Sequence, residues 1–288
     1  MGFVINNNLA ANTSYRNLNA TQGDLSKSLE KLSTGLRINR AADDAAGLSI
    51  SEGLKAQVTG SAVASRNAQD GISVIQTTEG ALTEVHSILQ RVRDLAVQAG
   101  NDSNNADSRK AILSEATSLT AEVGRIGQST NFNGIKLLDG TAGTAGVMSF
   151  QVGAGGTAND KITVDLNPAD LDAIKTALDG LTGTAASATD GFKDATSATA
   201  TIAALDTQIQ AVSTARASLG ASQNRLEHTI KSLNVAGENL QAAQSRIADV
   251  DMASEMVKFT KANILSQAGT AMLAQANQSS QGVLSLLR

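Results

Sequence analysis

The sequence contains no cysteine and no tryptophan, and its 288 residues include only one tyrosine, five phenylalanines and one proline. Without cysteine, the chain does without the disulfides that many extracellular proteins use. Aromatic residues make up 2% of the chain, so the core must be built from Leu, Ile, Val and Ala, which suit the seams between helices. Because Pro168 is the only proline, no other position forces a helix to stop. These absences favour long helices.

Charge and hydropathy exclude several classes of partner. The net charge is -4 and the pI is about 5.2, so no basic surface for nucleic acid or anionic lipid is expected. No apolar run reaches the roughly 18 residues that a membrane span needs. Residues 1–8 have neither the basic nor the apolar region of a cleaved signal. We therefore expect a cytosolic protein or one exported without a cleaved signal.

No pattern of residues indicates a catalytic, cofactor or metal site. His86 and His228 are the only histidines, and neither has the spacing of a metal-binding pair. The glycine-rich segment 153–156 has no following Lys-Ser/Thr pair, so a hairpin turn is favoured over a phosphate-binding loop. We therefore expect a protein that is not an enzyme and that holds no cofactor or metal.

Apolar residues recur every seven positions in the C-terminal third. One heptad phase between 202 and 247 is apolar throughout: Leu205, Val212, Leu219, Leu226, Leu233, Leu240 and Ile247. A strict seven-residue repeat predicts a helix that supercoils with a partner. At about 1.5 Å per residue this helix would be roughly 70 Å long, which is typical of a rod.

The N-terminal third carries matching stripes. The first consists of Ala11, Tyr15, Leu18, Gln22, Leu25, Leu29, Leu32 and Leu36. The second consists of Ile75, Leu82, Leu89 and Ala96 with Val85, Val92 and Ala99, and the third of Ile112, Ala116, Leu119, Val123 and Ile126. An isolated rod is unstable because ordering it offsets most of the gain from burial, so these stripes require one another. The two chain ends are therefore expected to pair.

Turn chemistry separates the stripes. Asp43 and Asp44 can cap a helix that begins at Ala45, and Asp107 or Ser108 can cap the next one after a polar loop at 100–105. Asn133-Gly134 is expected to end the third helical run. Residues 149–152 and 161–166 alternate apolar and polar side chains and predict a β-hairpin. The fold class is mainly α: a long antiparallel helical bundle or coiled coil formed by both ends, with a small β-hairpin in the middle.

Near the C-terminus, Met252, Met256, Phe259, Ile264 and Met272 have two interpretations. They can continue the seam between helices, or they can form a partner-binding face of adaptable side chains. Both can hold, since a stripe left uncovered in the monomer is an assembly surface. The residues expected in a self-assembly seam are Leu18, Leu25, Leu29, Leu32, Leu36, Met256, Phe259 and Ile264.

Several segments resemble bacterial flagellin. At the N-terminal side these are 32–39, 41–48, 89–98 and Asn131-Phe132-Asn133-Gly134, and at the C-terminal side 245–251 and 275–288. They occur in the family's order and cover roughly residues 1–140 and 200–288 of the chain. The resemblance implies a structural subunit of the flagellar filament, which polymerises into a helical tube for motility.

The resemblance also implies a domain plan. Residues 1–44 and 247–288 would form the inner tube, and residues 45–175 and 195–246 the outer tube with the hairpin. A short linker at 176–194 would replace the variable outer domains of longer flagellins. The chain would be exported unfolded through the flagellar channel and would reside in the extracellular filament as a homopolymer.

Further partners follow from the resemblance alone. They are a flagellar export chaperone, the filament cap and hook-junction proteins. The host Toll-like receptor that senses flagellin would contact Arg91, Leu95 and Glu122, which would also touch a neighbouring subunit. Asp94 stands where the family usually has Glu.

The sequence has three other interpretations. A hook–filament junction protein has similar ends but caps the tube in few copies. Some flagellins carry a metalloprotease insert, but neither histidine here is followed by Glu-x-x-His. The heptads alone would also permit an intracellular coiled-coil adaptor.

Overall fold

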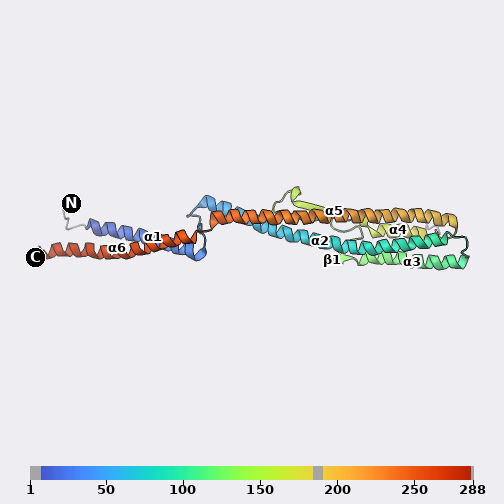
Figure 1. Cartoon of the computed structure of the whole chain (residues 1–288), viewed down its shortest axis with the longest axis horizontal. Coiled ribbons are helices and arrows are strands. Elements are labelled where there is room, and N and C mark those ends of the chain that lie inside the picture. The colour runs from blue at the N-terminus through green and yellow to red at the C-terminus, as the bar shows by residue number, and fades with distance from the viewer. Residues whose placement is uncertain (1–7, 184–190, 287–288) are drawn as a thin grey trace. The chain divides into compact units, whose positions relative to one another are not determined.

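The computed structural model describes residues 8–183 and 191–286, with side chains up to Gln278, and this part of the chain is mainly α-helical (Figure 1). The helices are α1 (Leu9–Thr34), α2 (Ala45–Ala99), α3 (Ala106–Ser129), α4 (Leu171–Thr182), α5 (Ala195–Ala248) and α6 (Met252–Leu286). The strands are β1 (Asn131–Phe132), β2 (Ile135–Lys136), β3 (Val147–Gln151) and β4 (Lys161–Asp165), with short 3-10 turns at Ala158–Asp160 and Asn167–Ala169. The predicted fold class is confirmed. None of the helices in these ranges is both long and apolar enough to cross a membrane.

The chain forms two compact units. The terminal unit comprises Met1–Gln57 with Glu238–Arg288, and the central unit is Val58–Gly237. The division falls inside α2 and α5, whereas the sequence suggested boundaries at the helix ends, near residues 44 and 247. The beginning of α2 belongs to the terminal unit because a side chain at Gly47 would meet Ile38 Cδ1 at 2.7 Å. The assignment of these units to an inner and an outer tube stays a prediction.

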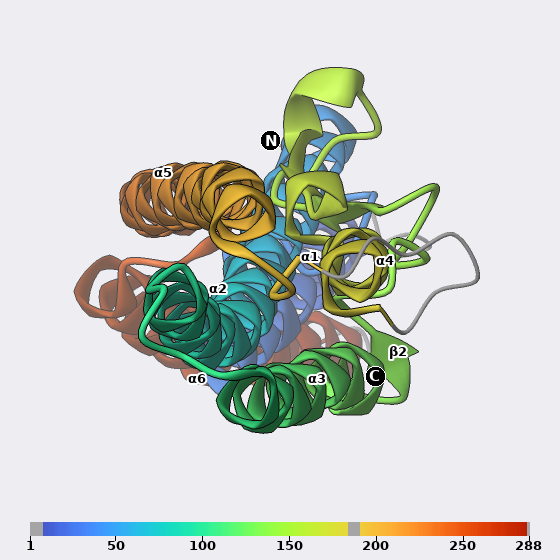
Figure 2. The same cartoon turned by 90° about the vertical axis from the view of Figure 1, so that its right-hand side faces the viewer.

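The core of the central unit lies between α2, α3, α4, α5 and the β3–β4 hairpin. Leu82 and Leu89 of α2 and Leu205 of α5 are fully buried, as both heptad patterns required. Figure 2 shows these helices nearly end-on. Guanidinium pairs link α2 to its neighbours at the surface: Arg91 to Glu115 on α3 and Arg93 to Asp206 on α5, both at 2.6 Å. Exposed pairs of this kind contribute little, so apolar packing holds this bundle together.

Two antiparallel hairpins lie between α3 and α4. β3 and β4 pair through Ser149 and Thr163, which confirms the predicted hairpin. β1 and β2 were not predicted, because the Asn133-Gly134 pair was interpreted only as the end of a helix. Both residues have positive φ, 50° and 80°, as a two-residue type I′ turn requires. α3 therefore ends earlier, at Ser129.

Helix caps explain where the chain changes direction. Asp44 accepts a hydrogen bond from the Gly47 N–H at 2.8 Å, which confirms the predicted start of α2. α3 is capped by Asn105 rather than by Asp107 or Ser108, because its side chain accepts from the Ser108 N–H.

The linker expected at 176–194 is wrong at its beginning, because α4 extends to Thr182. The glycine- and alanine-rich composition obscured the helical spacing of Leu171, Ile174 and Leu178, which are all buried. Asp170 caps α4 at its start, and Gly183, with a φ of 80°, ends it. Residues 184–190 of the expected linker lie outside the described residues.

Candidate assembly surface

In the terminal unit α1 packs along α6. Seven buried or half-buried residues of α1 follow alternating spacings of three and four: Ala11, Ser14, Leu18, Thr21, Leu25, Ser28 and Leu32. Glu30 and Lys31 are half-buried outside this row. Seven residues of α6 follow the same spacing, with Asn263 half-buried beside them: Glu255, Phe259, Ala262, Ser266, Gly269, Leu273 and Ala276. We call these two rows the inner seam. Many of its members are small, and an added Cβ at Gly269 would lie 3.2 Å from Leu18 Cδ1. The helices therefore approach closely while burying few large apolar side chains.

Polar contacts fix the register of the inner seam. The Ser28 hydroxyl donates to Glu255 Oε1 at 2.7 Å, and the Lys258 ammonium lies 3.0 Å from the other carboxylate oxygen. Glu255 is only 4% exposed. The hydrogen bond from Ser28 lowers the pKa of Glu255, and the bond from Lys258 adds to this against the opposing effect of burial. Because a buried carboxylate needs its donors, a slip of one helix past the other would be unfavourable.

The segment between α1 and α2 meets the segment between α5 and α6. Leu36 forms an antiparallel bridge with Asp249. The Arg37 guanidinium donates twice to the Ile247 carbonyl, at 3.1 and 2.7 Å, and the Arg37 N–H donates to Ala248. These donors satisfy carbonyls at the end of α5, which have no partner within the helix. The contact joins the two chain ends.

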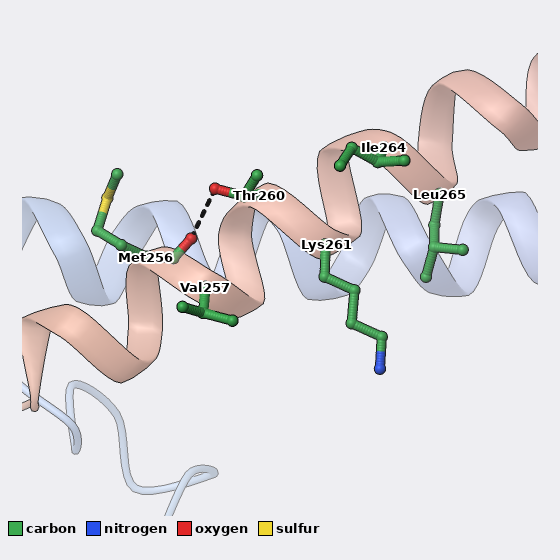
Figure 3. A pocket seen from close by; sticks show the side chains of 6 residues that line it. All are labelled: Met256, Val257, Thr260, Lys261, Ile264 and Leu265. Carbon is green, nitrogen blue, oxygen red and sulfur yellow. Dashed lines mark hydrogen bonds between the residues drawn. The ribbon is translucent and has the colours of Figure 1, made fainter.

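Outside the inner seam, α6 exposes several large apolar side chains among polar ones such as Thr260 and Lys261 (Figure 3). Val257 is 70% exposed and Ile264 61%. A shallow hollow is lined by Met256, Val257, Thr260, Lys261, Ile264 and Leu265. In Figure 3 Met256 and Ile264 project from one side of the helix and Val257 and Leu265 from the other. We call the exposed apolar side chains of α6 the outer face: Met252, Met256, Val257, Ile264, Leu265 and Met272. Helix α6 therefore carries large apolar side chains on more than one side, which the pairing with α1 alone cannot cover.

α1 also exposes large apolar side chains, namely Leu9, Tyr15 and Leu29. The stripe predicted for α1 is right in one heptad phase and wrong in the other. Leu18, Leu25 and Leu32 lie in the inner seam, but its second phase is Ser14, Thr21 and Ser28 rather than Tyr15, Gln22 and Leu29. The hydrogen bond from Ser28 to Glu255 turns this face of α1 inward, which leaves Leu29 54% exposed.

The residues expected in the self-assembly seam therefore divide into two groups. Phe259 lies in the inner seam with the α1 leucines, and Leu36 is half-buried at the bridge to Asp249. Leu29, Met256 and Ile264 are exposed and take no part in the inner seam. Val257 and Leu265 were missed. The signal for them was the number of large apolar residues between Met252 and Leu265, which is more than one seam between two helices can bury.

The three residues expected to meet a receptor and a neighbouring subunit do not form one exposed surface in the central unit. Leu95 is 2% exposed and belongs to the core. Arg91 pairs with Glu115, and Glu122 pairs with Arg125 at 2.6 Å. The hydrogen bond from Arg125 lowers the pKa of Glu122. Arg91 and Glu122 remain accessible in part, whereas Leu95 does not.

Comparison with known proteins identifies the family. Residues 5–143 match the model of the bacterial flagellin N-terminal helical region, and residues 202–287 match that of the C-terminal helical region. A flagellin of Halalkalibacterium halodurans is 54% identical over 99% of this chain and 100% of its own length. A flagellin of Bacillus subtilis is 51% identical over 99% of both chains.

Among solved structures, a putative flagellar hook-associated protein of Vibrio parahaemolyticus aligns with a TM-score of 0.56 over 72% of this chain and 100% of its own. At 16% identity this likeness shows a shared fold alone. The two family models and the relatives over nearly the whole length show that the chain belongs to the bacterial flagellin family.

Proposed function

We propose that the chain is a structural subunit of a bacterial flagellar filament, and that it polymerises through the outer face of α6 together with the exposed apolar side chains of α1. The observation that carries this proposal is the set of six large apolar side chains that α6 leaves exposed outside its inner seam. Large exposed apolar surfaces of this kind mark protein–protein contacts.

The size of the outer face supports a polymer rather than a single weak contact. Complete burial of one large aliphatic side chain is worth about 1.5–3 kcal/mol, and the six side chains are each roughly half exposed or more. Covering them would yield on the order of 5–10 kcal/mol before costs. Association itself costs about 4–15 kcal/mol, so contact with several neighbours is needed for a stable assembly.

The protein acts as an architectural component and not as an enzyme in this proposal. Its subunits form a homopolymer in the extracellular filament. The terminal unit would make the inner tube, because the exposed apolar side chains of α6 need to be covered by neighbouring subunits. The central unit would surround this tube.

A hook–filament junction protein is the alternative function. The relatives at about half identity over full length are flagellins, whereas the hook-associated protein shares only the fold. The two functions differ in copy number, because a junction protein ends growth and a filament subunit continues it.

Further partners belong to the same proposal. An export chaperone would cover the outer face before secretion, since exposed Val257 and Ile264 would otherwise associate prematurely. The filament cap and hook-junction proteins would meet the ends of the polymer. A host Toll-like receptor would reach Arg91 and Glu122 on the subunit, with Leu95 acting only as support beneath them.

Seeded polymerisation tests the proposed function. Purified full-length chain is added to sheared filament fragments, and the length of the fragments is followed by electron microscopy. Elongation that continues until the free chain falls to a constant concentration supports a filament subunit. Addition of a few copies followed by arrest would favour the junction protein, and no addition would refute both.

A further inference from the structure

Three of the five methionines of the chain lie on the outer face, and Met1 lies outside the described residues. The sequence has five, and Met252, Met256 and Met272 are 48%, 49% and 60% exposed on α6. Met148, by contrast, is half-buried against the core of the central unit. Since the chain contains no cysteine, these thioethers are its most readily oxidised side chains.

We propose that Met252, Met256 and Met272 form a reversible oxidation site that controls assembly. The inference rests on the proposed function, because it assumes that the outer face is buried on polymerisation. The oxidant is a peroxide. One peroxide oxygen is transferred to each sulfur, so that the O–O bond breaks and an S–O bond forms. The sulfur loses two electrons and hydrogen peroxide is reduced to water.

The position of the three sulfurs makes the reaction selective. Met256 projects from the surface of α6 at the edge of the apolar hollow, next to Val257 and in the same row as Thr260 and Ile264 (Figure 3). Oxidation of methionine follows access to the sulfur, so the three outer-face residues react before Met148.

Oxidation makes it unfavourable to bury these side chains between subunits. A sulfoxide is polar and accepts hydrogen bonds, whereas the thioether it replaces is an adaptable apolar group. Two donors line the hollow beside Met256, but the Thr260 hydroxyl already donates to the Met256 carbonyl and Lys261 projects from the other side of the helix (Figure 3). A sulfoxide buried against the aliphatic side chains of another subunit would therefore have few donors. Within one subunit the same oxygen remains in water, which leaves the fold unaffected. Oxidation therefore opposes assembly without unfolding the chain, and methionine sulfoxide reductases can reverse it.

The test compares oxidised and unoxidised full-length chains in the seeded assay. Subunits are treated with hydrogen peroxide, and peptide mass spectrometry locates each sulfur that gains one oxygen. We expect the outer-face sulfurs to react first and the concentration needed for elongation to rise at least about tenfold. Treatment with methionine sulfoxide reductases A and B should restore elongation.

Two variants provide the controls. A triple variant with Met252→Leu, Met256→Leu and Met272→Leu keeps the apolar face, so peroxide should change its elongation by less than about twofold. Met148→Leu should remain as sensitive as the unaltered chain.

The outcomes separate the two proposals. If unoxidised chain extends seeds and fully oxidised chain extends them equally well, the oxidation site is refuted while the filament function stands. Reaction of Met148 ahead of the three α6 residues would also refute it. Failure of the unoxidised chain to extend seeds refutes the proposed function and this inference with it.

Discussion

Ile264→Asp is the most direct test of the outer face. Ile264 is 61% exposed in the subunit, and in Figure 3 it projects from α6 beside Thr260. An exposed position tolerates a carboxylate, so the free energy of unfolding should change by no more than about 0.5 kcal/mol. The substitution is expected to weaken elongation, because a second subunit covers this position only in the polymer.

The magnitude follows from the exposed fraction. Complete burial of isoleucine is worth about 1.5–3 kcal/mol, so covering the exposed 61% contributes roughly 1–2 kcal/mol per subunit. The aspartate loses this gain and adds a desolvation penalty of about 2 kcal/mol or more, or becomes protonated. A total of at least about 3 kcal/mol corresponds to roughly a 100-fold rise in the concentration needed for elongation.

Light scattering with filament seeds measures that concentration, and circular dichroism measures helix content and thermal unfolding. Ile264→Leu is the matched control and should elongate nearly as the unaltered chain does, because volume and polarity are kept. Ile264→Asn has the shape of aspartate without the charge and should fall between the two. Normal elongation by Ile264→Asp would show that this face is not buried in the polymer.

Three further outcomes are expected. Leu29→Asp should also block elongation with little change in subunit stability, since Leu29 is 54% exposed. The control variant Lys27→Asp should still elongate. Normal filaments from Leu29→Asp would exclude α1 from the contact between subunits. The pKa of Glu255 is lower in the folded chain than in the unfolded chain, so the ionised carboxylate stabilises the fold. This stabilisation is complete above the unfolded-state pKa and is lost as the pH falls through the folded-state pKa, so α1–α6 pairing should weaken on acidification. Amide exchange measures this, and Glu255→Gln should be less stable at neutral pH but less sensitive to acid; an unchanged acid response in that variant would contradict the assignment. Leu89→Ala, at a fully buried position, should destabilise the central unit by about 2–5 kcal/mol in denaturant titrations, and a change below about 1 kcal/mol would contradict its place in the core.

Much of the fold followed from the sequence by itself. Strict heptads predicted α2 and α5, because a seven-residue apolar repeat forms a stripe on one side of a helix that is buried against another helix. Leu82, Leu89, Leu205 and Leu219 are buried as that repeat required. The cap at Asp44 and the β3–β4 hairpin were also predictable, since both depend on local chemistry.

Local chemistry did not decide everything nearby. The α4 helix was missed because Leu171, Ile174 and Leu178 stand in a region whose glycine and alanine content is typical of a linker. The β1–β2 hairpin was missed because Asn133-Gly134 fits both the end of a helix and a type I′ turn, and only the positive φ angles distinguish them.

Only the tertiary structure decided which side of the terminal helices faces inward. Apolar residues occur on several sides of α1 and α6, so periodicity alone permits more than one rotation about each helix axis. The pairing of Ser28 with Glu255 and the close approach at Gly269 select one of them. Because a buried carboxylate needs a donor and close helices need small residues, the small and polar side chains turn inward. Ile264, Val257 and Leu29 are left outside, where another subunit can cover them.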